Sequence, residues 1–101
     1  MDETPLFLEI KEKLIAQNRQ PEDIEKIEQG FLFAARLHEG QYRISEEPYI
    51  IHPVEVTKIL IDLRADTNTL IAALLHDVLE DTDTQPEEIQ KRFGDDVLTL
   101  V

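Results

Sequence analysis

The densest group of chemically active side chains follows a long apolar run in the C-terminal half of the chain. It consists of one histidine and three acids: His76, Asp77, Glu80 and Asp81. Imidazole and carboxylate groups together suit divalent cations such as Mn, Fe, Zn or Mg. If the segment is a single helix, its acids crowd the end where positive charge is favoured, and a bound cation would relieve the repulsion. The alternative is a set of solvated surface acids around a structural histidine.

The angular positions of these residues support a shared cleft. At about 100° per residue, His76 and Glu80 fall within about 40° of each other, and Asp77 and Asp81 follow on the same side. The apolar residues occupy the opposite side. The first two turns of the segment are apolar on most sides, which is typical of a helix central to a bundle. We therefore expect the acids to emerge into a cleft and not onto an open face.

Three further side chains could take part in such a site. His52 precedes Pro53, where a loop enters a helix, so its imidazole can turn away from the helix axis; it could equally be a turn or capping residue. Arg43 lies in the loop 41–51, which is long for a connection between helices. Its guanidinium could hold a phosphate or stack on a base, or it could be a solvated loop arginine. His38, near the end of a helix, is interpreted as structural.

Composition limits the classes of function. With 101 residues, the chain is expected to form one domain, 1–101, around one modest core. A net charge of −12 disfavours nonspecific nucleic-acid binding and attachment to anionic membranes. The absence of cysteine excludes disulfides and thiolate metal sites. Neither a signal peptide nor an apolar run of roughly 20 residues is found, so we expect a cytoplasmic protein.

Proline, glycine and capping residues mark the starts and ends of helical segments, and they predict an all-α fold of about five to six short helices. We expect helices over about 5–17, from Pro21 until Gly40 stops the helix as its C′ residue, from Pro53 to about 63, from Asp66 or Thr67 to Asp81, and from Thr84 to Gly94. Thr84 and Glu87 are expected to form a capping box. The last apolar stretch starts after Asp95 and is still apolar at Val101, so we expect a domain truncated at its C-terminus.

Three motifs together are more specific than any of these residues alone. They are the loop from Gly40 to Pro53, the segment from Ala72 to Thr82, and Phe93-Gly94. In this order they resemble the (p)ppGpp hydrolase domain of the RelA/SpoT family, which belongs to the HD-domain metal-dependent phosphohydrolases. The resemblance covers about residues 30–101. It implies an HD-domain-like helical bundle that binds Mn2+ and removes the 3′-pyrophosphate of (p)ppGpp, giving GDP or GTP.

The resemblance also implies roles for individual residues. His52, His76 and Asp77 match metal ligands, and Glu80 and Asp81 match the acidic pair that positions or activates the attacking water. This division of roles fits the chemistry, because a bound cation lowers the pKa of its water and neutralises phosphate charge. Nearby carboxylates can then accept the proton. Divalent cations other than Mn2+ could serve in the same place.

The resemblance also implies substrate contacts in the loop from Gly40 to Pro53. By the resemblance, Arg43 packs on the guanine base and Ser45 lies beside it. The family motif usually has Lys and Gly where this chain has Ile44 and Glu46, which predicts weaker or altered substrate binding. The family's fourth metal ligand is an aspartate that lies beyond the Phe-Gly motif and past Val101, so three ligands are expected from the present sequence.

Two other functions stay open at this point. One is a catalytically incomplete HD module that binds a nucleotide or a partner and regulates without catalysis. The other is an HD phosphohydrolase of a different nucleotide. In each case the expected partner is a small-molecule nucleotide, with no DNA and no membrane, and a synthetase domain is possible in the full-length protein.

Overall fold

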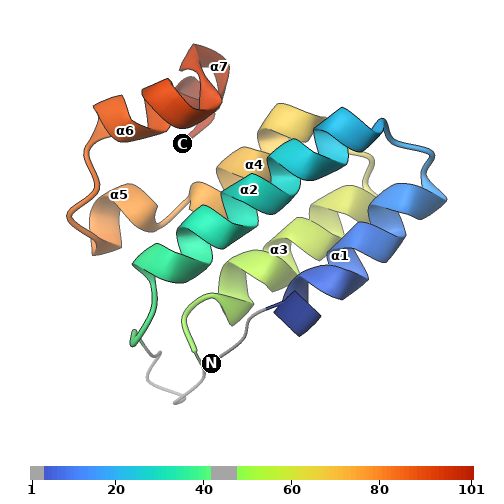
Figure 1. Cartoon of the computed structure of the whole chain (residues 1–101), viewed down its shortest axis with the longest axis horizontal. Coiled ribbons are helices and arrows are strands. Elements are labelled where there is room, and N and C mark those ends of the chain that lie inside the picture. Colours follow the sequence, from blue (N-terminus) through green and yellow to red (C-terminus); the bar gives the residue numbers. More distant parts are fainter. Residues whose placement is uncertain (1–3, 42–47) are drawn as a thin grey trace.

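The computed structural model describes residues 4–41 and 48–101. These residues are mostly helical and contain no β-strand, which confirms the all-α prediction. Within the described ranges there are seven helices: α1 (Thr4–Ala16), α2 (Pro21–Leu37), α3 (Ile51–Asp62), α4 (Thr67–Leu75), α5 (Val78–Asp81), α6 (Pro86–Phe93) and α7 (Asp95–Leu100). Figure 1 shows the four longest helices, α1 to α4, as a bundle, with α5, α6 and α7 gathered at one side of it.

Prolines and a capping aspartate set several of the helix starts. Pro21 and Pro86 open α2 and α6, where the missing N–H would have had no helical partner. Asp66 is the N-cap of α4, and its carboxylate accepts a hydrogen bond from the backbone N–H of Thr69 at 2.8 Å. Hydrogen bonds from the side chain and the backbone of Thr69 lower the pKa of Asp66. Asp66 is therefore the cap, as one of the two predicted alternatives had it.

Two predicted helix ends are wrong. The capping box at Thr84 does not form, because α6 begins at Pro86 and its N-cap is Gln85, whose side chain makes no capping hydrogen bond. Helix α2 ends at Leu37 with His38 as its C-cap, so Gly40 lies one residue beyond the predicted C′ position. Gly40 has a φ of +81°, so it lies in the left-handed region as glycine allows, but in the turn beyond the helix.

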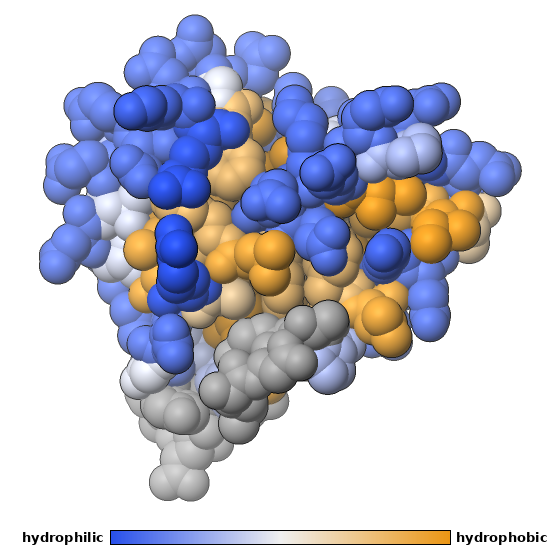
Figure 2. Space-filling model, viewed as in Figure 1, coloured by the Kyte–Doolittle hydropathy of each residue, from blue (hydrophilic) through white to orange (hydrophobic). Residues whose placement is uncertain are grey.

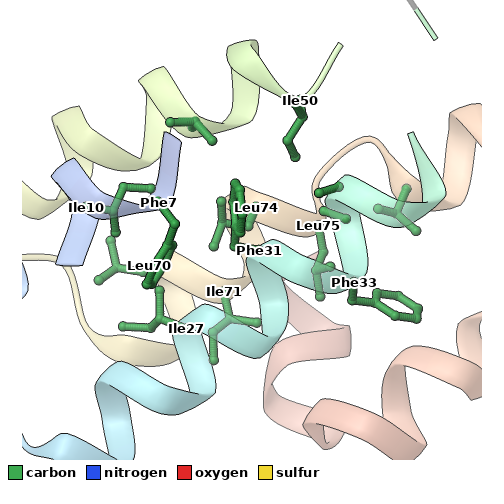
Figure 3. Close-up of a cluster of buried hydrophobic side chains, with 14 of the residues drawn as sticks. Phe7, Ile10, Ile27, Phe31, Phe33, Ile50, Leu70, Ile71, Leu74 and Leu75 are labelled. Carbon is green, nitrogen blue, oxygen red and sulfur yellow. The ribbon is translucent and has the colours of Figure 1, made fainter. Parts of the chain in front are cut away.

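Helix α4 is the centre of the fold. It packs against α2, α3 and α7, while α1 packs on α3 and α2. Four of its side chains, Leu70, Ile71, Leu74 and Leu75, have no exposed surface. Figure 3 shows them beside Phe7, Ile10, Ile27 and Phe31 in the interior of the bundle. A helix that is apolar on most sides is thus surrounded by other helices, as its sequence predicted.

Two helices approach each other closely at a glycine. Gly30 is buried in α2, and a Cβ atom added there would lie 3.2 Å from Cγ2 of Ile71 on α4. Ordinary van der Waals contact begins farther out, so a side chain at this position would press on α4. The absence of a side chain at position 30 therefore sets the spacing of α2 and α4.

The surface is polar and strongly acidic, in keeping with the net charge of −12. Figure 2 shows apolar side chains between polar ones on the face viewed. Large apolar side chains with substantial exposure are Leu8, Ile15, Leu32, Ile59, Leu63 and Leu100. Among residues 4–41 and 48–101, no helix has both the length and the apolar character needed to cross a membrane.

Candidate functional site

The predicted fourth helix is interrupted where its chemistry begins. Helix α4 ends at Leu75, and α5 starts at Val78. His76 keeps helical backbone angles, but Asp77 has φ −95° and ψ 0°, outside the helical region. One expected helix is therefore two, which explains why seven segments are found where five to six were predicted.

This break corrects the electrostatic interpretation of the acids. Asp77 precedes α5, and Glu80 and Asp81 lie in its first turn, so none of them belongs to the last turn of α4. Acids are favoured at the start of a helix, where the peptide dipoles present positive charge. The predicted crowding of acids in the last turns of one helix is therefore not found, and positions on a single helical wheel do not carry past Leu75.

The three predicted metal ligands line one cavity. It has a volume of about 340 Å³ and lies between α3, α4 and α7, with His52, His76 and Asp77 in its lining. The rest of its wall is mainly apolar: Pro53, Val56, Leu60, Ala72, Ala73 and Leu100, with Thr69. Two imidazoles and a carboxylate are a donor set that fits a divalent cation such as Mn2+. The fold thus brings residues 24 positions apart in sequence to the same cavity.

His52 reaches this cavity from the start of α3. The helix begins at Ile51, two residues before the predicted start at Pro53. His52 is therefore exposed on the first turn, whereas Pro53 behind it is buried. A proline in the first turn needs no backbone donor, so the histidine can sit in a regular helix beside the cavity.

The side chains are not yet in coordinating positions. Within the described part of the chain, no three His, Asp or Glu side chains converge closely enough to hold a metal ion. His76 instead lies against its own neighbour, with 3.0 Å between Nδ1 and the Oδ1 of Asp77. The His76 side chain is 74% exposed and that of Asp77 15%. The predicted ligand set shares a cavity, but its side chains do not converge on one point.

The two predicted catalytic acids face a different hollow. Glu80 and Asp81 line a groove of about 830 Å³ between the end of α2 and the segment that joins α5 to α6. Most of its charged lining is acidic, with Asp83, Glu87 and Glu88 added to the pair, and Arg36 supplies positive charge. We name this hollow the acidic groove. The candidate ligands and the candidate acids therefore line two different hollows.

Tyr49 connects the two halves of the site. Its hydroxyl donates a hydrogen bond of 2.7 Å to Oδ2 of Asp81. That hydrogen bond, partial burial, and the negative charges of Asp77 and Asp81 raise the pKa of the Tyr49 hydroxyl. The phenol therefore stays protonated and remains a donor at neutral pH. Sequence reasoning placed Tyr49 only in the loop near Arg43, and a loop aromatic three residues before His52 is a weak signal by itself.

The residues behind Tyr49 were also missed or assigned no role. The ring of His38 stacks on the ring of Tyr49, with 4.7 Å between centroids and 22° between planes. Gln41 contacts both His38, through a 3.0 Å Nδ1···Oε1 hydrogen bond, and Asp81, whose carbonyl accepts from Nε2 at 3.0 Å. His38 was interpreted as structural, and its side chain is buried, with 2% exposure.

The predicted substrate-binding residues lie outside the described ranges. Arg43 and Ser45 fall between positions 42 and 47, as do Ile44 and Glu46, where the sequence departs from the family motif. Their assignment therefore continues to depend on the sequence resemblance. The residues on each side of this segment, Gln41 and Pro48, are described, and Gln41 lines the acidic groove.

Known proteins match this chain over the region that contains the candidate site. The sequence profile of the HD domain matches residues 30–101. A guanosine-3′,5′-bis(diphosphate) 3′-pyrophosphohydrolase of Vibrio cholerae is 53% identical over 78 residues, which are 77% of this chain and 11% of the relative. One from Aquifex aeolicus is 50% identical over 90 residues, 89% of this chain and 13% of the relative. The bifunctional (p)ppGpp synthase/hydrolase SpoT of Escherichia coli K12 is 48% identical over 88 residues, which are 86% of this chain and 12% of the relative.

The relatives are much longer than this chain. The chain spans about a tenth of the length of the curated relatives it matches, so their names describe much larger proteins. The matched region nevertheless includes every described residue of the site from His38 to Asp81. The chain belongs to the HD-domain family, and the resemblance of its motifs to the RelA/SpoT (p)ppGpp hydrolase domain is confirmed.

Proposed function

We propose that the chain is a metal-dependent hydrolase domain for (p)ppGpp, which uses water to release pyrophosphate from the 3′ position and leaves GDP or GTP. The observation that carries this proposal is the shared cavity of His52, His76 and Asp77. Relatives at about half identity are named for the same reaction, which supports the choice of substrate. We further propose that residues 1–101 act as one domain and that the protein is cytoplasmic.

The HD-domain family implies a divalent metal, and we propose Mn2+ held by His52, His76 and Asp77. When bound, such an ion lowers the pKa of a coordinated water and offsets phosphate charge. Local positive charge is needed because a chain with net charge −12 repels an anionic nucleotide.

The proposed catalytic acids act from the acidic groove. Glu80 and Asp81 are exposed to the acidic groove, so either carboxylate can accept a proton from the attacking water. Arg43 would pack on the guanine base with Ser45 beside it, as the resemblance implies. A synthetase domain elsewhere in the full-length protein is proposed as a partner, since SpoT carries both activities in its name.

The test is hydrolysis of ppGpp by the full chain with MnCl2, followed as release of GDP and pyrophosphate. Wild-type protein should turn over ppGpp, and His76→Ala should lose Mn2+ binding and turnover together. Lys91→Ala, on the exposed surface of α6 away from both hollows, is the control and should retain activity. A panel with pppGpp and deoxynucleotides identifies the substrate, and turnover of deoxynucleotides alone would reject (p)ppGpp.

A second function is favoured by one observation. The candidate ligands are not in coordinating positions among the described residues, as expected of an HD module that binds a nucleotide without catalysis. Metal analysis of the purified chain separates the two functions. About one Mn2+ per chain, lost in His76→Ala, supports the hydrolase. Metal-free protein whose nucleotide affinity is unchanged in His76→Ala supports the binding module.

A further inference from the structure

A continuous set of contacts joins the end of α2 to Asp81 on α5. The ring of Tyr49 stacks on His38, and its hydroxyl donates to Oδ2 of Asp81 at 2.7 Å. The backbone N–H of Tyr49 donates to the carbonyl of Gln41 at 2.9 Å. Gln41 in turn donates from Nε2 to the carbonyl of Asp81 at 3.0 Å. Asp81 is thus held through both its side chain and its backbone.

The hydrogen bonds of Gln41 decide the tautomer of His38. Because Nε2 of Gln41 donates to a carbonyl of Asp81, the Oε1 atom must be the one that faces His38. Nδ1 of His38 therefore carries a hydrogen and donates to it. Nε2 of His38 is buried and has no partner among the described residues. A buried polar atom without a partner opposes folding, so a purely structural role would favour an apolar residue here.

Asp81 needs such a support if its carboxylate is to act in the reaction. It is exposed and is the last residue of a helix of four residues, a setting in which a side chain is free to rotate. A hydrogen bond on Oδ2 restricts this rotation and leaves Oδ1 available to a water molecule. Preorganised groups accelerate a reaction more than freely rotating ones, because no reordering is needed at the moment of reaction.

We propose that Tyr49 is a positioning residue that fixes the carboxylate of Asp81, and that His38 and Gln41 hold Tyr49 in place for this purpose. The proposal rests on the proposed function, since it assigns Asp81 a part in the hydrolysis. Tyr49 acts through Asp81 and is not itself a proton acceptor.

The decisive variant is Tyr49→Phe in the full chain, which removes one hydroxyl and keeps the ring that stacks on His38. We expect kcat for ppGpp with Mn2+ to fall about tenfold, with KM and the melting temperature little changed. In an Asp81→Asn background, Tyr49→Phe should cause no further loss, since the carboxylate it positions is gone. Lys13→Met, which removes a 2.9 Å bond to Asp62 far from the site, is the matched control and should leave kcat unchanged.

A pair of variants at His38 separates its ring from its hydrogen bond. His38→Phe keeps an aromatic face for Tyr49 but loses the bond to Gln41, and should retain most of the kcat. His38→Ala loses both and should match Tyr49→Phe in kcat. Equal multiplicative losses from Tyr49→Phe in the wild-type and Asp81→Asn backgrounds, or a lower melting temperature with unchanged kcat, would show that Tyr49 is merely structural.

The contact between Tyr49 and Asp81 can be measured without an activity assay. The chain has two tyrosines and no tryptophan, so tyrosine fluorescence reports on Tyr49 over a background from Tyr42. Asp81→Ala removes the carboxylate that quenches Tyr49, so emission should rise, and it should not rise in the Tyr49→Phe background. Unchanged emission in Asp81→Ala overturns the contact alone. Wild-type protein that does not hydrolyse ppGpp overturns the proposed function, and the positioning role with it, even if the emission changes as expected.

Discussion

The bundle of α1 to α4 and the segment from His76 to Gln85 are built by different means. In the bundle, side chains such as Phe31 and Leu74 have no exposed surface and are placed by packing. In the segment from His76 to Gln85, His76 is 74% exposed and Asp81 is held by hydrogen bonds from Tyr49 and Gln41. Packing fixes the bundle, whereas the segment is anchored by one buried side chain, Val78, and a few directional contacts hold its exposed residues.

This difference separates stability from activity. Burial of apolar surface is the main favourable term in folding, so the bundle should account for most of the free energy of unfolding. Exposed polar residues contribute little to it, since water can replace their partners. Changes in the bundle should therefore alter stability first, and changes between His76 and Gln85 should alter chemistry first.

The largest expected effect is on stability. Phe31→Ala removes a fully buried ring that lies 5.3 Å from the ring of Phe7, and should lower the free energy of unfolding by about 3–5 kcal/mol. Urea denaturation followed by circular dichroism measures this. Leu32→Ala, the next residue on α2 and 45% exposed, is the control and should cost well under half as much. Equal losses from the two variants would contradict the packing of α2 described here.

The next effect is on chemistry. Asp77→Asn keeps the size of the side chain but removes the charge of a proposed metal ligand, so ppGpp hydrolysis should fall at least about a hundredfold. The free energy of unfolding without metal should change by less than about 1 kcal/mol, because the contact of Asp77 with the exposed side chain of His76 is weak. Calorimetric titration with MnCl2 and urea denaturation check both parts. Destabilisation with intact Mn2+ affinity would assign Asp77 to the folding core.

A smaller effect concerns the cap of α4. Asp66→Ala removes the side chain that accepts from the N–H of Thr69 and should destabilise the chain by about 1 kcal/mol at pH 7. The pKa of Asp66 is lowered in the folded state, so its contribution is full above the ordinary value of 3.8 and is lost as pH falls through the folded pKa. The difference between wild type and variant should shrink below about pH 4. Denaturation curves at pH 7 and pH 3 measure it, and a difference that grows on acidification has the wrong sign.

The smallest effect is at the surface of the bundle. Lys13→Met breaks a 2.9 Å pair with Asp62 that joins α1 to α3, and should cost about 0.5 kcal/mol or less. Part of that cost should vanish at 1 M NaCl, because exposed charges are screened. Thermal melts at low and high salt test this. A loss above about 2 kcal/mol would mean that directional contacts also hold the bundle together.

Apolar spacing was enough to predict the bundle but could not locate the break in the fourth helix. Leu74, Leu75 and Val78 are all fully buried at helical spacing, so the apolar pattern continues through the interruption. The non-helical backbone of Asp77 leaves no trace in that pattern. The cap at Asp66, by contrast, depends on a bond to a residue three positions away and was predictable from local chemistry.

The candidate site residues were chosen from the sequence and stay predictions, and their arrangement could not be predicted. Motif order and residue type identified His52, His76 and Asp77, and the fold places all three on one cavity. Tyr49 could not be found in this way, because its partner Asp81 is 32 positions later and only the folded chain brings them within 2.7 Å. Contacts between distant residues of ordinary type are the part that sequence patterns do not encode.

The close approach at Gly30 gives protein engineers a control that lies outside the site. A Cβ atom at position 30 would meet Ile71 at 3.2 Å, and Ile71 belongs to the helix whose last residue precedes His76. A graded series from Gly30→Ala to Gly30→Val should therefore displace α4 by small steps and carry His76 with it. Metal affinity and melting temperature would be measured across the series. They would show how far α4 can shift before the cavity of His52, His76 and Asp77 loses its metal affinity, although none of its lining residues is changed.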